Sequence, residues 1–179
     1  TRRRGADMAL VTPVPLLPAG EVGPVHFVAI GGAGMSGIAQ AYADLGVEVS
    51  GSDRDDSAAL RKLAAAGVRT HVGHDAAQLG DARTVVVSSA IKPGNVELDE
   101  ARRRGLRVWH RSAALGALML GRRGIAITGT HGKTTTTGMV ATMLIGAGAD
   151  PGYVIGSPLA SSGESAALGT GPAFVVEAD

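Results

Sequence analysis

The chain has 179 residues, of which 45% are hydrophobic and only 3% aromatic, and its formal net charge is +1. This small net charge gives no support for a nucleic-acid-binding surface, and the absence of cysteine excludes disulfides and thiolate zinc sites and fits a cytoplasmic protein. No apolar run approaches the roughly 18 residues that a membrane-spanning helix requires, so we expect no membrane segment.

The first 22 residues predict a flexible lead-in. Three arginines follow Thr1, and Pro13, Pro15 and Pro18 interrupt the apolar residues after them. The chain begins without Met and stops just after an apolar stretch, so we expect it to be a fragment of a longer protein.

A glycine-rich turn follows the first predicted strand, residues 25–30. Gly32, Gly34 and Gly37 satisfy the pattern G-x-G-x-x-G, and a predicted helix over 38–45 follows. Asp53 comes just past a second predicted strand, residues 47–50. A strand before this turn, a helix after it and an acid beyond the next strand are typical of a nucleotide-diphosphate site. Gly34 would admit the diphosphate and Asp53 would accept from a hydroxyl; alternatively, the glycines serve only close helix–strand packing.

Strands and helices then alternate along the chain. This alternation predicts an α/β fold with a Rossmann-like, doubly wound parallel sheet over residues of about 23–111. His71 and His74 lack carboxylate or cysteine partners at ligand spacing, so we expect no metal there. The predicted helices are 57–66, 96–104 and 112–120, and the predicted strands are 68–72, 84–88 and 107–109.

Polar residues follow the strand 84–88. In open α/β sheets ligands bind at the carboxyl edge of the strands, so Ser88, Ser89 and Asn95 are candidate ligand contacts. The alternative is that these three residues serve only turn chemistry.

A second glycine turn follows residues 121–124, which we interpret as a hinge, and a new strand that starts at Ile125. The sequence G-T-x-G-K-T at 129–134 is a short form of the phosphate-binding loop and leads into a predicted helix over 133–145. Lys133 would neutralise the outer phosphates of ATP, and Thr134 is placed to bind magnesium. The alternative is an ordinary glycine turn with a solvated lysine.

The end of the chain supplies a second candidate for magnesium. Residues 153–155 predict a short strand, 157–171 a loop and 174–176 another strand. Glu177 follows that strand, where a second magnesium contact is expected downstream of a phosphate loop. The alternative is a solvated acid.

The presence of both glycine turns restricts the class of enzyme that the sequence predicts. A hydride-transfer enzyme that uses NAD needs the first turn but not the second, whereas a simple ATPase or kinase needs only the second. The pair therefore favours an enzyme that holds a nucleotide-linked substrate on one domain and activates it with ATP on the next.

Four segments resemble the Mur ligases of peptidoglycan synthesis. They are 31–39 (GGAGMSGIA), 51–53 (GSD), 88–91 (SSAI) and 129–136 (GTHGKTTT), and the resemblance covers nearly all of residues 23–179. It implies three segments: the lead-in 1–22, a UDP-substrate-binding Rossmann-like domain 23–122, and the truncated start of an ATP-binding central domain 123–179.

The resemblance also implies an activity and its residues. The lactyl carboxylate of UDP-N-acetylmuramate would attack ATP to give an acyl phosphate, and the amine of L-alanine would then displace phosphate. Lys133 and His131 would act in catalysis, and Thr134 and Glu177 would bind Mg²⁺. The UDP-substrate contacts would be Gly32, Ala33, Gly34, Met35, Ser36, Gly37, Asp53, Ser88, Ser89 and Asn95. The ATP contacts would be Gly129, Thr130, His131, Gly132, Lys133, Thr134 and Thr135.

The family motif Glu-Ala-Asp, after which further acids are expected, is cut at Asp179. We therefore expect residues 1–179 alone to be inactive as a ligase, although they could keep weak binding of the UDP-sugar. A murein-recycling ligase of the same family is an alternative activity.

Overall fold

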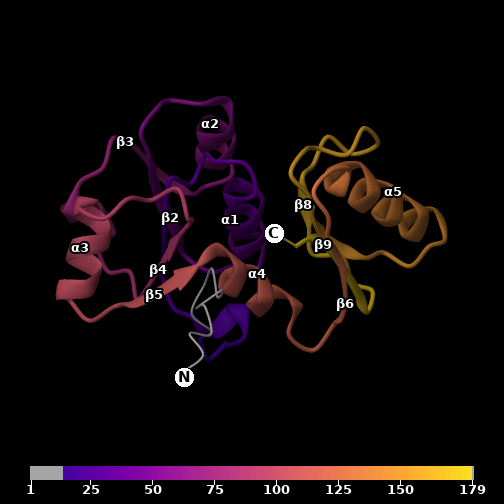
Figure 1. Ribbon diagram of the computed structural model, residues 1–179, viewed down its shortest axis with the longest axis horizontal. Helices are drawn as coiled ribbons and strands as arrows, with labels where there is room; N and C mark the ends of the chain where they lie inside the picture. The colour runs from indigo at the N-terminus through magenta and orange to yellow at the C-terminus, as the bar shows by residue number, and fades with distance from the viewer. Residues whose placement is uncertain (1–13, 179) are drawn as a thin grey trace, which may run out of the picture.

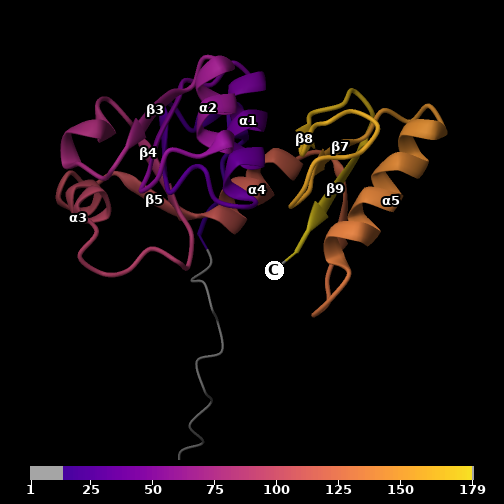
Figure 2. The ribbon, with the colours of Figure 1, turned by 90° about the horizontal axis from the view of Figure 1, so that it is seen from above.

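Two sheets lie on either side of helix α1 in the computed structural model, which describes residues 14–178 (Figure 1). From one flank to the other, the layers are helix α3, the first sheet, helices α1 and α4, the second sheet and helix α5 (Figures 1 and 2). One layer of helices therefore covers both sheets.

The first sheet contains five parallel strands in the order β3-β2-β1-β4-β5. The chain winds outward from β1 in one direction as far as β3 and then crosses to β4 on the other side of β1. This confirms the predicted Rossmann-like sheet, whose crevice for ligands lies beyond the carboxyl ends of β1 and β4, where the winding reverses. The strands are β1 (Val25–Val28), β2 (Val49–Asp53), β3 (Arg69–Val72), β4 (Thr84–Val87) and β5 (Arg107–His110).

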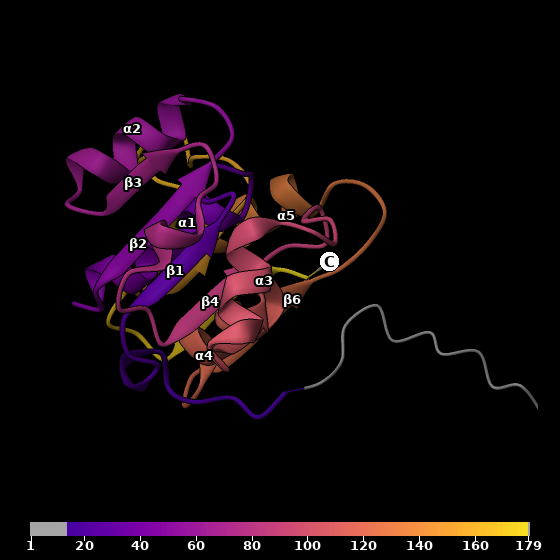
Figure 3. The same ribbon diagram turned by 90° about the vertical axis from the view of Figure 1, so that its left-hand side faces the viewer.

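Four α-helices belong to this part of the chain. Ser57 caps the second of them by accepting a hydrogen bond from the N–H of Leu60, and Gly67 follows this helix at a positive φ. The first helix begins three residues earlier than predicted, because Gly34 already takes the left-handed conformation of its N-cap. The helices are α1 (Met35–Asp44), α2 (Ala58–Ala65), α3 (Val96–Arg103) and α4 (Arg111–Met119), with short 3-10 turns at Ala19–Glu21 and Ala76–Leu79. Figure 3 shows α3 in front of the sheet.

The predicted flexible lead-in is corrected for its second half. Residues 1–13 lie outside the described residues. Val22 is 1% exposed, and its carbonyl accepts a hydrogen bond from the hydroxyl of Thr84. Val14 and Leu17 also pack against the core of the first sheet. Residues 14–22 are thus held against this sheet.

The second sheet has the order β6-β9-β7-β8. The first three strands are parallel, and β8 pairs antiparallel with β7. Strand β8 corrects the prediction of an irregular loop over 157–171, since two small residues, Ala166 and Ala167, pair there with Val154 and Tyr153. The elements are β6 (Arg123–Ile127), α5 (Lys133–Gly146), β7 (Gly152–Val154), β8 (Ala166–Ala167) and β9 (Ala173–Glu177).

A single apolar cluster joins the two sheets. Phe27 of β1 and Ile38 of α1 belong to it together with Val154, Phe174 and Val176 of the second sheet. The predicted hinge is also anchored: the guanidinium of Arg122 donates to the carbonyls of Leu168 and Gly169 and lies over the ring of Phe174. Burial of apolar surface therefore holds the two parts together.

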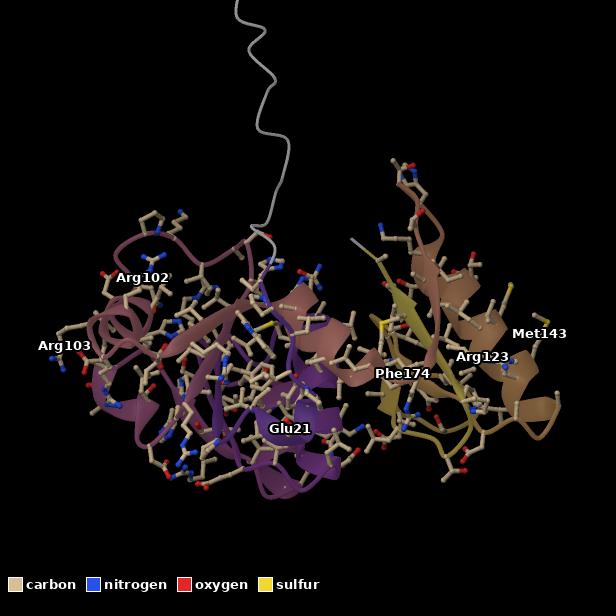
Figure 4. The ribbon with its side chains drawn as sticks, turned by 90° about the horizontal axis from the view of Figure 1, so that it is seen from below. Glu21, Arg102, Arg103, Arg123, Met143 and Phe174 are labelled. Carbon is tan, nitrogen blue, oxygen red and sulfur yellow. The ribbon has the colours of Figure 1, made fainter. Side chains whose placement is uncertain are left out.

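The outer face of α5 exposes apolar side chains. Met139 is 61% exposed and Met143 is 65% exposed, and Met143 points away from the second sheet (Figure 4). Arg102 and Arg103 project from the last turn of α3 at the opposite end of the molecule (Figure 4). Among residues 14–178, none of the helices combines the length and hydrophobicity that crossing a lipid bilayer demands.

Candidate functional site

The first glycine turn is folded tightly on itself. Ala29 has a φ of 61°, which is rare for a residue other than glycine, and its carbonyl accepts a hydrogen bond from Gly32. Gly34 has a φ of 77°, and the N–H of Met35 donates to the carbonyl of Gly32 at 3.0 Å. The turn therefore exposes its backbone at the start of α1.

Asp53 braces this turn from the end of β2. Its Oδ2 accepts a hydrogen bond from the N–H of Gly31 at 2.8 Å. The position that a Cβ would take on Gly31 lies 2.9 Å from the same oxygen, so the backbone and the carboxylate approach closely. The structure thus gives Asp53 a role in holding the turn, in addition to the hydroxyl contact predicted from the sequence.

The second glycine turn enters α5 in the same way. Gly129 and Gly132 both have positive φ, and Gly132 occupies the N-cap with a φ of 77°, like Gly34 in the first turn. The ammonium of Lys133 donates to the carbonyl of Gly129 at 2.8 Å and so folds back over the turn. Thr130, His131 and Thr135 are exposed around it.

The two glycine turns differ from the starts of the other α-helices in their N-caps. Ser57, Asn95 and His110 cap α2, α3 and α4 with their side chains. Within residues 14–178, α1 and α5 begin at a left-handed glycine with no side-chain cap. Among α1 to α5, the two N-termini without a capping side chain are thus the two predicted to bind phosphate, where an anion would complete the hydrogen bonding.

Glu177 lies beside the second turn. Its carboxylate accepts a hydrogen bond from the N–H of Gly156 at 2.8 Å. The position of a Cβ on Gly156 would lie 3.2 Å from Oε2 of Glu177 and 3.5 Å from the hydroxyl oxygen of Thr134. The two predicted magnesium ligands, Thr134 and Glu177, therefore lie next to Gly156. Because this glycine has no side chain, the space between the two ligands stays open.

Among the cavities lined by both parts of the chain, one has a volume of about 410 Å³. It lies between the carboxyl edge of the first sheet and the ends of β7 and β9, so the first glycine turn and Glu177 face the same space. Its lining includes Gly32, Ala33, Gly34, Met35, Ser88, Ser89 and Arg111 from the first part, and Val154, Ile155, Gly156 and Glu177 from the second.

Four of the predicted UDP-substrate contacts, and all the predicted ATP contacts at 129–135, lie outside this lining. Ser36 faces a neighbouring, smaller cavity, and Gly37 faces the second sheet. Asp53 lies behind the turn that it braces. Asn95 uses its side-chain oxygen to accept from the N–H groups of Glu97 and Leu98, which is the turn chemistry left open as its alternative.

Arg111 is a site residue that the sequence analysis missed. Its Nη1 lies 2.7 Å from the position of a Cβ on Gly34, so the guanidinium covers the first glycine turn and lines the cavity. Next to it, His110 lies between Ser89 and Ser112, and burial together with the charge of Arg111 lowers its pKa. Both residues lie at the carboxyl end of β5. Ser88 was selected because ligands bind at the carboxyl edge of an open α/β sheet, and the same argument could have found His110 and Arg111.

No group of three or more potential metal-ligating side chains occurs among the described residues. His74 donates from Nδ1 to Glu97, a fully buried acid. Glu97 follows His74 by 23 residues, so this carboxylate partner was not visible in the sequence at ligand spacing.

A protein-family model described as "Mur ligase family, catalytic domain" matches residues 24–123. The chain is 71% identical over 172 residues to a UDP-N-acetylmuramate–L-alanine ligase from Cutibacterium acnes, covering 96% of this chain and 36% of that protein. The ligase of the same name from Thermobifida fusca is 56% identical, with the same coverage. The chain thus spans about a third of the length of these relatives.

Solved structures of related ligases resemble the fold. The UDP-N-acetylmuramate–alanine ligase from Thermotoga maritima superposes with a TM-score of 0.79 at 31% identity, covering 86% of this chain and 36% of that one. The UDP-N-acetylmuramate:L-alanyl-gamma-D-glutamyl-meso-diaminopimelate ligase from Neisseria meningitides gives 0.82 at 33% identity, covering 88% and 53%.

Proposed function

The chain belongs to the Mur ligase family, and from this premise we propose that it provides the UDP-N-acetylmuramate site and part of the ATP site of an L-alanine ligase. The observation that carries this proposal is the cavity of about 410 Å³, which is lined by both the first glycine turn and Glu177. The identity of 71% to a ligase of this name supports L-alanine as the amine substrate.

The second turn fits ATP and Mg²⁺ by the chemistry of its groups. Its helix has no side-chain cap, and its lysine already lies over the turn. Thr134 and Glu177 offer oxygen ligands, which Mg²⁺ prefers. ATP with its metal would supply phosphoryl transfer to the substrate carboxylate, whose acyl phosphate then reacts with the amine of L-alanine.

The residues of this chain have distinct tasks in the proposed reaction. Gly32, Gly34 and Arg111 hold the diphosphate of the UDP-sugar at the start of α1, and Asp53 keeps their turn in shape. Lys133 stabilises the charge that develops on the transferring phosphoryl group. The exposed His131 lies in the same turn and contacts either the phosphates or the muramoyl group.

The murein-recycling ligase is the second candidate, because a ligase named for UDP-N-acetylmuramate and the peptide L-alanyl-gamma-D-glutamyl-meso-diaminopimelate shares this fold with a TM-score of 0.82. The two activities differ in the amine substrate. A full-length protein that accepts a peptide but not L-alanine would be the recycling ligase.

The first test is a calorimetric titration of residues 1–179 and of the full-length protein with UDP-N-acetylmuramate, with NAD as the comparison. We expect both to bind the UDP-sugar and neither to bind NAD. In the full-length protein, phosphate release from ATP should require both UDP-N-acetylmuramate and L-alanine. Phosphate release at the same rate with and without the UDP-sugar would identify a simple ATPase or kinase instead. Binding of NAD without binding of the UDP-sugar would identify an oxidoreductase.

A further inference from the structure

Gly37 of α1 faces the second sheet. The position of a Cβ on Gly37 would lie 3.3 Å from Cγ1 of Val154, 3.6 Å from Cβ of Ala166 and 3.6 Å from Oγ of Ser165. These three nearest atoms come from β7, β8 and the residue before β8, and none comes from the first sheet. Figure 1 shows α1 between the two sheets with β8 beside it.

This placement differs from the general role of the third glycine in G-x-G-x-x-G, which is close packing of the helix on the strand before it. Here the glycine allows α1 to approach an element more than a hundred residues later in the sequence. Around it, Ile38, Val154 and Ala166 belong to one buried apolar cluster, so the approach is close-packed.

The contact lies directly beside both walls of the cavity. Gly37 comes three residues after Gly34, the N-cap of α1, and Met35 lines the cavity. Val154 also lines the cavity, and it precedes by two residues the N–H of Gly156 that holds Glu177. A displacement at the contact between Gly37 and Val154 therefore moves the diphosphate turn relative to Glu177.

We propose that Gly37 is a positioning residue whose missing side chain sets the distance between the UDP-sugar turn and the ATP-side carboxylate Glu177. This inference rests on the proposed ligase function. Since an enzyme can lose about a hundredfold in rate when reacting groups are misplaced by 1 Å, a close contact at this point controls the chemical step.

The test is a set of variants of the full-length protein: Gly37→Ala, Gly37→Val, Val154→Ala and the double variant Gly37→Ala/Val154→Ala. Alanine is a better helix former than glycine, so the alanine variant keeps α1 folded. We expect kcat for amide formation to fall about threefold in Gly37→Ala and about a hundredfold in Gly37→Val, with Kd for UDP-N-acetylmuramate changed less than about threefold. The double variant should recover the rate, because truncation of Val154 removes the atom nearest to the new methyl group.

Gly138→Ala is the matched control. Gly138 is also a helical glycine, and its Cβ would meet only Leu159 of the same part at 3.4 Å. This variant should retain the kcat of the wild-type protein.

Three outcomes decide between the inference and its alternatives. If Gly37→Ala weakens UDP-N-acetylmuramate binding and Val154→Ala does not restore it, Gly37 acts in binding and the inference is wrong. An unchanged kcat in Gly37→Val also overturns it. If the wild-type protein forms no amide, the proposed function is wrong. The thermal midpoints of the same four variants then test the contact by itself. If the shift of the double variant equals the sum of the two single shifts, positions 37 and 154 are not coupled and the contact is refuted.

Discussion

The imidazole of His26 donates from Nε2 to Oε1 of Glu97 at 3.0 Å, and both side chains are fully buried. The other carboxylate oxygen of Glu97 accepts from the hydroxyl of Ser52 and from Nδ1 of His74, each at 2.7 Å. This cluster ties α3, which carries Glu97, to β1 and β2 on the face of the sheet away from α1. It therefore supports the strands whose carboxyl ends form the first site.

Replacement of Glu97 should destabilise the first part strongly. We expect Glu97→Ala to lower the free energy of unfolding by about 3–5 kcal/mol, because it leaves the buried donors of His26 and Ser52 without their acceptor. Urea denaturation of residues 1–179 measures this loss. Glu100→Ala on the same helix is the control, since Glu100 pairs with the exposed Arg103 of α3 and with Arg104, the residue that follows it. Equal shifts of the two midpoints would contradict the prediction.

The same cluster predicts a dependence of stability on pH. Burial alone would raise the pKa of Glu97, but hydrogen bonds from His26 and Ser52 hold it below its ordinary value. A lowered pKa in the folded state gives stability that is fully present above the unfolded pKa of about 4.3 and is lost as the pH falls through the folded pKa. The difference in unfolding free energy between wild type and Glu97→Gln should therefore shrink below about pH 4. A difference that stays constant down to pH 3 would show that folding does not lower the pKa of this carboxylate.

Lys133→Ala tests the second glycine turn. We expect kcat of the full-length protein to fall about 10²–10³-fold, as for loss of one preorganised group that stabilises developing charge. Binding of UDP-N-acetylmuramate should not change, because Lys133 lies on the other turn. The control is Lys62→Ala, whose exposed pair with Glu164 is worth only about 0–1 kcal/mol. Comparable losses in the two variants would argue against the assigned role of Lys133.

Arg111→Ala tests the residue that covers the first glycine turn. A hydrogen bond to a charged group contributes about 1.5–3 kcal/mol, so we expect Kd for UDP-N-acetylmuramate to rise about 10- to 100-fold in a calorimetric titration. The affinity of the wild type should also fall more steeply with salt than that of the variant. Arg69→Ala is the control, because Arg69 pairs at the surface with Glu48. An unchanged Kd for Arg111→Ala would remove Arg111 from the binding site.

The sequence predicted the elements with strong local signals. The apolar strands, the alternation of strands and helices and both glycine turns are readable from neighbouring residues, and the first sheet follows from them. The uses of Asn95 and Gly37 are not readable in this way. An amide side chain suits both a helix cap and a ligand, and only the fold shows that Asn95 caps α3. The contact between Gly37 and Val154 joins residues far apart in the chain, and β8 consists of two alanines that carry no strand signal.

The pairing of β6 has a consequence for synthesis on the ribosome. In the described part of the chain, β6 hydrogen-bonds only to β9, and Arg123 pairs with Ala173, 50 residues later. At about 5–20 residues per second, β9 is translated several seconds after β6. During that interval the strand that leads into the second glycine turn has no partner, and its unpaired backbone and apolar side chains are open to chaperones or to other nascent chains. The ATP turn is therefore among the last parts of residues 14–178 to take shape.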